Sequence, residues 1–410
     1  MLKGKHIVVG ISGGIAAYKI PELIRLLIKE GAEVRVTTTR NALQFVTETT
    51  LRTLSGHPVY SDVFAAVNEH TTEHISLPEW ADLMVVAPAT ANVLGKMASG
   101  IADDALTTTY AACVSLKPVV IAPAMNDKMY ENSATRDAFH VLATQGVFLL
   151  DCAEGFLACG TEGKGRMQES DALCEACRMA LTPQTLAGQR VMITAGPTRE
   201  SIDPVRFVSN YSSGKMGYAI AQECLRRGAD VTLIAGPTEQ HVTRIALYSE
   251  IKRNLFTLIP VESAEQMYEA ASNRWTDADI AILSAAVADF TPEQAAAEKI
   301  KKQPGQTQFM LPMTVTTDIA AALGKTKRNQ RLIGFALETE NAEQNAIKKL
   351  RSKNLDLIVL NSLRDSGAGF GCDTNKVTLI TADTKKYLPL LSKQEVAARI
   401  IDAIESNLLS

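Results

Sequence analysis

The stretch KHIVVGISGGIAAYKIPELIRLLIKEGAEVRVTTTR, residues 5–40, decides the fold of the first part of the chain. It begins with an apolar run at 6–10, continues through 15–30, where apolar residues recur at helical spacing, and returns to an apolar run at 34–38. Gly31 stands where the helix must end, because glycine adopts the left-handed conformation of a helix cap without strain. The pattern predicts a strand–helix–strand unit with two parallel strands.

The same pattern returns in the second half of the chain. A strand is predicted at 190–194, a helix at 216–227 and a strand at 231–235, and the turn GAEV at 31–34 is repeated as GADV at 228–231. Periodicity lapses between the two halves, near 182–188. Further strands are predicted at 83–87, 119–122, 280–284, 332–335, 355–361 and 377–381, and helices at 171–181 and 393–407. We therefore predict an α/β protein of two doubly wound, Rossmann-like domains with mostly parallel sheets, at 1–183 and 189–410.

Composition excludes several classes of protein. The chain has 410 residues, 46% hydrophobic and 21% charged, with a formal net charge of -3, which is typical of a globular protein without nucleic-acid partners. Its longest apolar runs, at 83–91 and 118–125, are shorter than the roughly 18 residues of a membrane span. The N-terminus leads directly into a strand pattern and lacks the features of a signal peptide. Seven scattered cysteines fit a reducing compartment, so we expect a cytoplasmic protein without membrane partners.

The loops that leave the predicted strands are the places to search for ligands, because doubly wound sheets bind them beyond the carboxyl ends of the strands. The first such loop, GISGGIAAYK at 10–19, is a glycine-rich turn that opens a helix. Its backbone N–H groups favour an anion, and Ser12 adds a hydroxyl donor. The spacing is not G-x-G-x-x-G, and a Walker motif occurs nowhere in the chain. Taken alone, this loop is equally compatible with a tight turn that binds nothing.

Three further segments give the first half a recognisable pattern: EHISL at 73–77, PAMNDKMY at 123–130 and LACGTEGKGRM at 157–167. With the glycine-rich turn they resemble, in order and spacing, the flavin-containing decarboxylases of phosphopantothenoylcysteine, over residues 5–180. The resemblance implies a flavodoxin-like domain that binds FMN. It implies that His74 is the base assisting thiol oxidation, that Asn126 orients the substrate carboxylate, and that Cys159 donates a proton. The FMN contacts that we expect are Ser12, Gly13, Gly14, Thr39 and Thr107, with Thr108 as the alternative to Thr107.

The chemistry of decarboxylation explains why a flavin is needed. Loss of carbon dioxide from a cysteine-derived carboxylate leaves a carbanion, and FMN can create an electron sink by oxidising the CH2–SH group to C=S. Each residue also has a simpler interpretation: His74 as a surface or capping residue at a strand edge, Asn126 as a turn former and Cys159 as a packed thiol. Tyr130 replaces the tryptophan of many relatives, for which we expect a change of packing only.

A zinc site is the alternative role for the cysteines of the first half. Cys174 and Cys177 form a C-x-x-C pair, and Cys152 and Cys159 precede them. The segment 171–181 has the pattern of an amphipathic helix, however, and the chain offers no second closely spaced pair. The sequence therefore disfavours zinc.

The second half has its own glycine- and hydroxyl-rich loops, TAGPTRE at 194–200 and SNYSSGKMG at 209–217, with DPVRF at 203–207 between them. Such a loop is a plausible phosphate cradle. These motifs resemble the phosphopantothenate–cysteine ligases, and the resemblance extends over residues 189–400. Its further segments are AAVADF at 285–290, EKIKK at 298–302, GFALET at 334–339 and KNLD at 353–356.

Amide formation requires activation of a carboxylate, here by attack on a nucleotide α-phosphate, and cations must screen the two anions. The resemblance implies that Lys299, Lys349 and Lys353 contact the CTP phosphates and that Asn210 holds the acyl-cytidylate. It assigns Asp289 to nucleotide or Mg²⁺ binding and Phe335 to the cytosine site. Ala285, Asp318 and Ile319 complete the nucleotide site. Where relatives read N-P-D-I, this chain has TTDI at 316–319, which leaves selectivity for cytosine open. The lysine run at 299–302 alone would be a solvated surface, and Asp289 alone a helix cap.

Together the two resemblances imply a bifunctional enzyme of coenzyme A biosynthesis. Its substrates would be 4'-phosphopantothenate, cysteine and CTP, with FMN and Mg²⁺ as cofactors. They also imply a homo-oligomer, trimeric through the decarboxylase and dimeric through the ligase, up to a dodecamer. The alternatives are a non-catalytic flavin-binding regulator and an NAD-dependent oxidoreductase with tandem Rossmann domains. The absence of a dinucleotide fingerprint disfavours the second.

Overall fold

The computed structural model describes residues 2–64, 73–156, 160, 162–243, 255–302, 304–338, 340–362 and 371–408. They form two compact α/β units, one built mainly from the chain up to Pro183 and the other mainly from Gln184 onwards. In the described ranges, no helix combines the length and the apolar character that crossing a bilayer takes.

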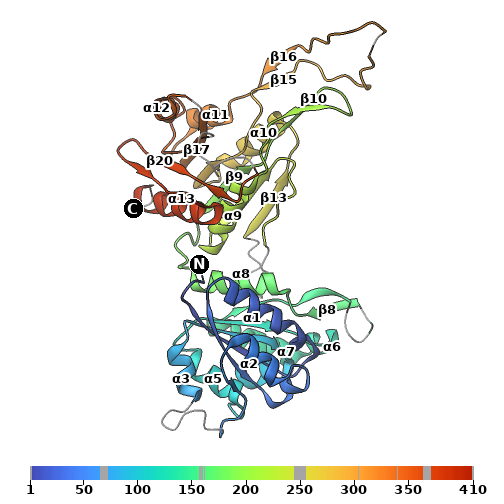
Figure 1. Ribbon diagram of the computed structural model, residues 1–410, viewed down its shortest axis with the longest axis vertical. Coiled ribbons are helices and arrows are strands. Elements are labelled where there is room, and N and C mark those ends of the chain that lie inside the picture. Colours follow the sequence, from blue (N-terminus) through green and yellow to red (C-terminus); the bar gives the residue numbers. More distant parts are fainter. Residues whose placement is uncertain are drawn as a thin grey trace. The chain divides into compact units, whose positions relative to one another are not determined.

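The first unit, coloured from blue to green in Figure 1, is built on a parallel sheet. Its strand order is β3-β2-β1-β4-β5-β6. The strands are β1 (His6–Ile11), β2 (Glu33–Thr38), β3 (Val59–Tyr60), β4 (Leu83–Ala89), β5 (Val119–Pro123) and β6 (Phe148–Leu149). Successive strands are added on one side of β1 up to β3 and on its other side from β4 onwards. The point where the order reverses, between β1 and β4, is where doubly wound sheets bind their ligands.

Helices cover both faces of this sheet, because alternate strand side chains point to opposite sides. Ile7 and Val9 of β1 belong to one core and Val8 to the other. The first core contains residues of α1 (Ile20–Lys29), α2 (Glu48–Ser55) and α8 (Ser170–Leu181). The second contains residues of α3 (Glu73–Trp80), α4 (Ala91–Ala98), α5 (Ala105–Cys113) and α7 (Ser133–Thr144). An antiparallel hairpin of β7 (Ala153–Phe156) and β8 (Glu162–Arg166) lies outside the sheet.

Two local expectations for the first unit were wrong. The helix expected at 15–30 begins as the 3-10 helix η1 (Ile15–Lys19), and α1 starts only at Ile20, with Pro21 in its first turn. Proline is suited to that position because it has no N–H group to leave unpaired. The strand edge expected at His74 is helix α3, which the sequence concealed because Pro78 lies inside it.

The second unit repeats the topology of the first and extends it. Its sheet has the order β13-β12-β9-β14-β17-β18-β20-β21, parallel from β13 to β18 and antiparallel beyond. The strands are β9 (Arg190–Ala195), β12 (Asp230–Ala235), β13 (Phe256–Pro260), β14 (Ile280–Leu283), β17 (Arg331–Glu338), β18 (Leu357–Ser362), β20 (Val377–Ile380) and β21 (Lys385–Tyr387). The prediction of two doubly wound, mostly parallel sheets is therefore confirmed.

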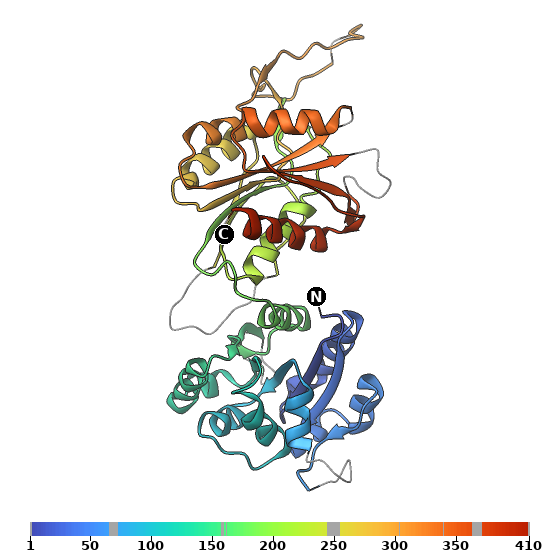
Figure 2. The same ribbon diagram turned by 90° about the vertical axis from the view of Figure 1, so that its left-hand side faces the viewer.

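The helices of the second unit also lie on both faces of the sheet. α9 (Lys215–Arg226) and α13 (Lys393–Leu408) share one core. α10 (Ala264–Trp275), α11 (Ile319–Thr326) and α12 (Ala342–Ser352) share the other. Figure 2 shows α12, in orange, and α13, in dark red, on opposite sides of the strands. Short antiparallel ribbons extend from this unit: β10 (Arg199–Ser201) with β11 (Phe207–Ser209), β15 (Phe290–Pro292) with β16 (Met313–Val315), and β19 (Thr374–Asn375) with β22 (Leu391–Ser392).

The repeated turn of the sequence has the same geometry in both units. Gly31 and Gly228 have φ of 89° and 84°, in the left-handed region. The next residues bond back to the helix, Ala32 N to Leu27 O at 3.1 Å and Ala229 N to Cys224 O at 3.0 Å. The turn therefore caps the helix and starts the parallel strand in a single step.

Candidate functional sites

A cavity of about 1200 Å³ lies at the carboxyl edge of the first sheet. Its walls come from the segments that follow β1, β2, β4 and β5 and from the β7–β8 hairpin. Among the lining residues are Gly13, Gly14, Thr39, Thr90, Asn126, Phe156, Gly160 and Arg166. The cavity thus spans the switch point between β1 and β4, as expected for a ligand site of this topology.

The glycine-rich turn forms one wall because its backbone passes close to the neighbouring loop. A Cβ at Gly13 would lie 2.5 Å from Cβ of Asn41, so only glycine fits there. Behind the turn, Oγ of Ser12 donates to the carbonyl of Pro88 at 2.7 Å and accepts from N of Thr90 at 3.0 Å. Ser12 is fully buried and holds the turn against the loop after β4, whereas the glycines line the cavity.

Thr39 lies at the end of β2 and contributes a hydroxyl that is buried without a hydrogen-bond partner in the described structure. Buried hydroxyls are normally hydrogen-bonded, since leaving one unpaired costs about 1–3 kcal/mol. A polar ligand would remove this deficit. The hydroxyl of Thr107 is differently engaged, because it forms a capping box with Asp104 at the start of α5 and does not line the cavity.

Asn126 is placed by the start of a short helix, α6 (Asp127–Glu131), and its Oδ1 accepts from N of Lys128 at 2.9 Å. The preceding residue is bonded to the β7–β8 hairpin, from N of Met125 to O of Gly165 at 3.0 Å. A Cβ at Gly165 would stand 2.2 Å from O of Met125, so this close approach requires glycine. The hairpin is therefore packed directly against the segment that carries Asn126.

Two of the predicted catalytic residues are not brought into this cavity. His74, in the first turn of α3, is absent from the lining, and its Nδ1 is buried without a partner in the part of the chain that the structure describes. Cys159 lies outside the described residues, although Phe156 and Gly160 on either side of it line the cavity. The structure thus collects Gly13, Gly14, Thr39 and Asn126, with Ser12 behind them.

The remaining cysteines of the first unit are part of its core. Cys152, Cys174 and Cys177 are buried, and burial raises the pKa of Cys152 to about 12. Burial likewise raises the pKa of Cys177 far above that of an ordinary thiol. Thiols in such surroundings stay protonated and behave as small apolar side chains. The described residues contain no group of three or more His, Cys, Asp or Glu side chains arranged to hold a metal ion.

A second cavity, of about 690 Å³, lies at the carboxyl edge of the second sheet. It is lined by every residue predicted for the ligase site except Lys299: Asn210, Ala285, Asp289, Asp318, Ile319, Phe335, Lys349 and Lys353. Lys299 is exposed on a segment fixed elsewhere, since N of Ile300 donates to Oδ2 of Asp203 at 3.1 Å. Its assignment to the nucleotide phosphates stays a prediction.

The loop before α9 gives this cavity an anion-binding wall. Gly214 has a φ of 75°, and its N donates to Oγ of Ser212 at 3.3 Å. Nδ2 of Asn210 donates to the carbonyls of Ala286 and Val287, at 3.1 Å each, and so fixes the loop after β14. These contacts hold the start of α9 beside β14, at the switch point of the second sheet.

Ion pairs inside the cavity engage two of the predicted lysines. Nζ of Lys353 lies 2.8 Å from Oδ2 of Asp318, and Nζ of Lys349 lies 2.6 Å from Oε1 of Glu338. Burial is the largest influence on Asp318 and works to raise its pKa, but the hydrogen bond and charge of Lys353, together with hydrogen bonds from backbone N–H groups at the start of α11, hold that pKa below the usual value. The lysines are thus held in place by carboxylates that an anionic ligand would have to replace.

Three polar lining residues belong to none of the motifs found in the sequence: Asn361, Asn375 and Lys393. Oδ1 of Asn361, at the end of β18, is buried and has no hydrogen-bond partner in the described ranges. Lys215, which also lines the cavity, belongs to the loop at 209–217 that the sequence marks as a plausible phosphate cradle. Asn361 and Lys393 follow ordinary strand and helix patterns, so only their position around the sheet reveals them.

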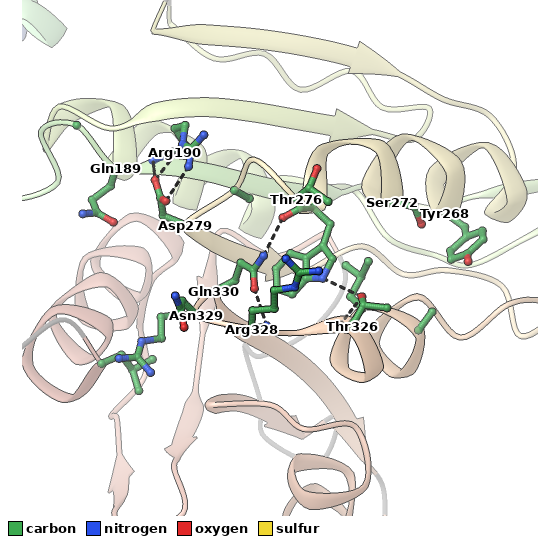
Figure 3. Close-up of a pocket in the computed structure, with 17 residues that line it drawn as sticks. Gln189, Arg190, Tyr268, Ser272, Thr276, Asp279, Thr326, Arg328, Asn329 and Gln330 are labelled. Carbon is green, nitrogen blue, oxygen red and sulfur yellow. Dashed lines mark hydrogen bonds and ion pairs between the residues drawn. The ribbon is translucent and has the colours of Figure 1, made fainter.

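The second unit also has a concave region of about 1100 Å³ at the opposite, amino edge of its sheet (Figure 3). Its polar groups bind one another: Arg190 pairs with Asp279 at 3.0 Å, and the Trp275 indole donates to Thr326 at 3.1 Å. Helices α10 and α11 end here, and helix carboxyl ends disfavour anions. The carboxyl edge is therefore the better place on this sheet for an anionic ligand.

Comparison with known proteins matches both halves of the chain. Residues 1–182 match the family model described as Flavoprotein, and residues 186–408 match that of the DNA/pantothenate metabolism flavoprotein C-terminal domain. The coenzyme A biosynthesis bifunctional protein CoaBC of Bacillus subtilis (strain 168) is 46% identical over 408 residues, which cover 98% of this chain and 97% of that protein.

Two further similarities have a narrower scope. A cysteine/cysteine sulfinic acid decarboxylase from an unknown prokaryotic organism is 45% identical over 368 residues, covering 88% of this chain and 98% of that protein. The crystal structure of the C-terminal domain of a CoaBC protein has 42% sequence identity and a TM-score of 0.44, and the match covers 54% of this chain and 97% of that one.

Proposed function

The chain belongs to the family of coenzyme A biosynthesis bifunctional proteins, and on that premise we propose which residues carry out each reaction. The protein combines a ligase and a flavin-dependent decarboxylase of coenzyme A biosynthesis. The second unit condenses 4'-phosphopantothenate with cysteine, using CTP. The first unit decarboxylates the product to 4'-phosphopantetheine. One observation carries this division: each sheet has, at its carboxyl edge, a cavity lined by the motif residues of its own half.

The first cavity fits a flavin. The unpartnered hydroxyl of Thr39, the close backbone approach at Gly13 and the exposed backbone of Gly14 supply polar contacts where the ligand of such a sheet binds. We propose FMN as the flavin, held by these residues, with Ser12 supporting the turn. When bound, it supplies a reversible two-electron oxidation of the substrate's CH2–SH group.

The residues of the chain itself place the substrate and move protons. Asn126, fixed at the start of α6, orients the carboxylate that leaves as carbon dioxide. His74 takes up the thiol proton, and Cys159 returns a proton after carbon dioxide has left. The β7–β8 hairpin, which lies against the Asn126 segment, excludes water from the reacting group.

In the second cavity, Lys349 and Lys353 exchange their carboxylate partners for the phosphates of CTP. Asp318 and Ile319 at the start of α11, with Ala285 and Phe335, surround the base. Asn210 holds the acyl-cytidylate while the amine of cysteine attacks its carbonyl carbon and displaces CMP. Because Thr316 and Thr317 replace the usual pair before Asp318, discrimination between CTP and other triphosphates is the property to measure first.

A Mg²⁺ ion would be held chiefly by the substrate in this site. Asp289 lines the cavity, and the described residues offer no cluster of three metal-binding side chains. Mg²⁺ commonly binds one or two carboxylates together with substrate phosphates. We therefore propose that Asp289 is the protein ligand of a Mg²⁺ ion that arrives with CTP.

We further propose a homo-oligomer, trimeric through the decarboxylase units and dimeric through the ligase units, up to a dodecamer. The position of His74 supports this, because it does not line the cavity of its own chain and would have to act in that of a neighbouring subunit. A sedimentation mass of one or two chains would contradict the assembly.

The decisive experiment supplies the purified protein with 4'-phosphopantothenate, cysteine and CTP. Pyrophosphate, carbon dioxide and 4'-phosphopantetheine are expected, and the protein should be yellow with bound FMN. A parallel reaction with cysteine alone tests the activity named for the relative of unknown prokaryotic origin. Colourless protein that leaves phosphopantothenoylcysteine unchanged would overturn the role of the first unit, and CTP that releases no pyrophosphate would overturn that of the second.

A further inference from the structure

Lys393 is an unusually buried lysine in the wall of the second cavity. It is the first residue of α13, only 8% of its surface is exposed, and its Nζ donates to the carbonyl of Cys372 at 2.5 Å. Lysine is rarely buried to this extent unless it is paired. In the described ranges its ammonium bonds to no carboxylate, so two of its three N–H donors have no protein acceptor.

Lys215 places a second ammonium group in the same corner. It begins α9, which packs against α13, and its Nζ donates to Asp373 at 2.6 Å and to the carbonyl of Gly371 at 3.0 Å. Burial and the charge of Lys215 both lower the pKa of Lys393. Two neighbouring cations destabilise each other unless an anion joins them. Asp373 offsets this repulsion only in part, because its side chain is 89% exposed and its charge is screened by solvent.

The two other lysines of the lining are paired differently. Lys349 and Lys353 each have a carboxylate as direct partner, Glu338 and Asp318, and of these two Asp318 lines the cavity. The corner at Lys215 and Lys393 therefore has the larger unused capacity to donate hydrogen bonds to an anion. It also adjoins the loop of Ser212 and Gly214, whose backbone favours phosphate.

We propose that Lys393, together with Lys215, binds the β- and γ-phosphates of the nucleoside triphosphate, the part that leaves as pyrophosphate. The proposal rests on the ligase function proposed above. A carboxylate oxygen of the acid attacks the α-phosphorus, and the bond from that phosphorus to the bridging oxygen breaks. The electron pair stays on pyrophosphate, and the two ammonium groups stabilise the charge that develops there.

The test uses the full chain and inorganic pyrophosphate alone as the probe. Lys393→Met removes charge-assisted hydrogen bonds to pyrophosphate. We therefore expect the variant to bind pyrophosphate on the order of tenfold more weakly or worse, as measured by calorimetry, and its KM for CTP to rise by a similar factor. The KM for 4'-phosphopantothenate should change less than about twofold, because a contact with pyrophosphate does not touch the acid. Lys386→Met is the matched control, since Lys386 is an exposed lysine of β21 outside the cavity.

Unchanged pyrophosphate affinity in a folded Lys393→Met protein overturns the proposal. Folding of the second unit is checked by thermal unfolding followed by circular dichroism, because decarboxylation reports on the first unit only. Should the variant unfold, Lys215→Met gives the same measurement at a more exposed position, and unchanged affinity there is equally decisive. If wild-type protein releases no pyrophosphate from CTP, it is the ligase function that fails, whatever the binding data show.

Discussion

Oη of Tyr130 donates a hydrogen bond of 2.5 Å to Oδ1 of Asp151. The other carboxylate oxygen accepts from Nζ of Lys164 at 2.6 Å, and Lys164 lies over the Tyr130 ring at 5.1 Å. Tyr130 belongs to α6, next to Asn126, and Lys164 belongs to β8. One carboxylate thus joins the hairpin of the first cavity to the helix that positions Asn126. The sequence led us to expect that tyrosine in place of tryptophan changes packing only. In the structure the Tyr130 hydroxyl also makes a hydrogen bond, to Asp151.

Asp151→Asn should impair decarboxylation and leave condensation intact. Burial, and next the hydrogen bond to Asp151, raise the pKa of Tyr130 to about 12, so its hydroxyl is a donor at neutral pH. Asp151 accepts these two hydrogen bonds on two different oxygens, whereas an asparagine side chain has one oxygen and one NH2 group. One of the two bonds would therefore be lost, and the hairpin would shift relative to Asn126. We expect kcat/KM for phosphopantothenoylcysteine to fall roughly tenfold. In Tyr130→Phe, which removes one hydrogen bond only, kcat/KM should fall less. Equal activity of Asp151→Asn and wild type would show that Asp151 does not hold the hairpin in place for decarboxylation.

Gly13→Ala should reduce the flavin content of the purified protein. The new Cβ would lie 2.5 Å from Cβ of Asn41, so the turn must move away from the ligand that it contacts. Flavin absorbance per chain is the measurement, and we expect most of it to be lost. Gly95→Ala, in α4 with open space around its Cβ, is the matched control and should retain the flavin. Full occupancy in Gly13→Ala would place the flavin elsewhere.

Asn210→Asp should stop condensation and spare decarboxylation. Asp has no N–H to donate to the carbonyls of Ala286 and Val287, and its charge repels both those oxygens and the anionic substrate. Loss of these contacts predicts a decrease in pyrophosphate release of about a hundredfold or more. Conversion of phosphopantothenoylcysteine by the same sample is the internal control. Loss of both activities would contradict the assignment of Asn210 to the ligase alone.

Cys159→Ser should stop decarboxylation and spare condensation. A serine hydroxyl is a much weaker acid than a thiol and protonates the product poorly. Phosphopantetheine formation should therefore fall sharply, whereas pyrophosphate release from CTP stays at the wild-type rate. A serine variant that forms phosphopantetheine normally would show that Cys159 is not the proton donor.

Asp203 should make the stability of the second unit dependent on acid pH. Its hydrogen bonds with Arg206, and further ones from backbone N–H groups that include Ile300, hold the pKa of Asp203 far below its usual range. A lowered folded-state pKa stabilises the fold above the unfolded value of about 3.9, and this contribution is lost as the pH falls further. The stability difference between wild type and Asp203→Asn should thus shrink below about pH 4 in thermal unfolding. Exposed Asp383→Asn should show no such trend, and a constant difference for Asp203→Asn would refute the argument.

Much of the site could be predicted because its residues stand in contiguous motifs. Asn126 and Asn210 were assigned through motifs that resemble those of known families, and each motif follows a predicted strand, so both residues were expected at the carboxyl edge of a sheet. Thr107 and Lys299 stand in equally suggestive segments. The structure engages the Thr107 hydroxyl in a local helix cap. It holds the residue after Lys299 through the hydrogen bond from N of Ile300 to Asp203, which is distant in sequence, so the motif could not show where that segment lies.

By itself, the sequence determined the two doubly wound sheets and the repeated Gly31 and Gly228 turns. Strand and helix periodicity are local properties that depend on which side chains must be buried. Only the tertiary structure decided which residues share a cavity. Lys393 lies 178 positions after Lys215 and belongs to no motif, yet packing of α13 on α9 brings both to one corner. Such proximity depends on how distant segments close around the sheet, and no local pattern encodes it.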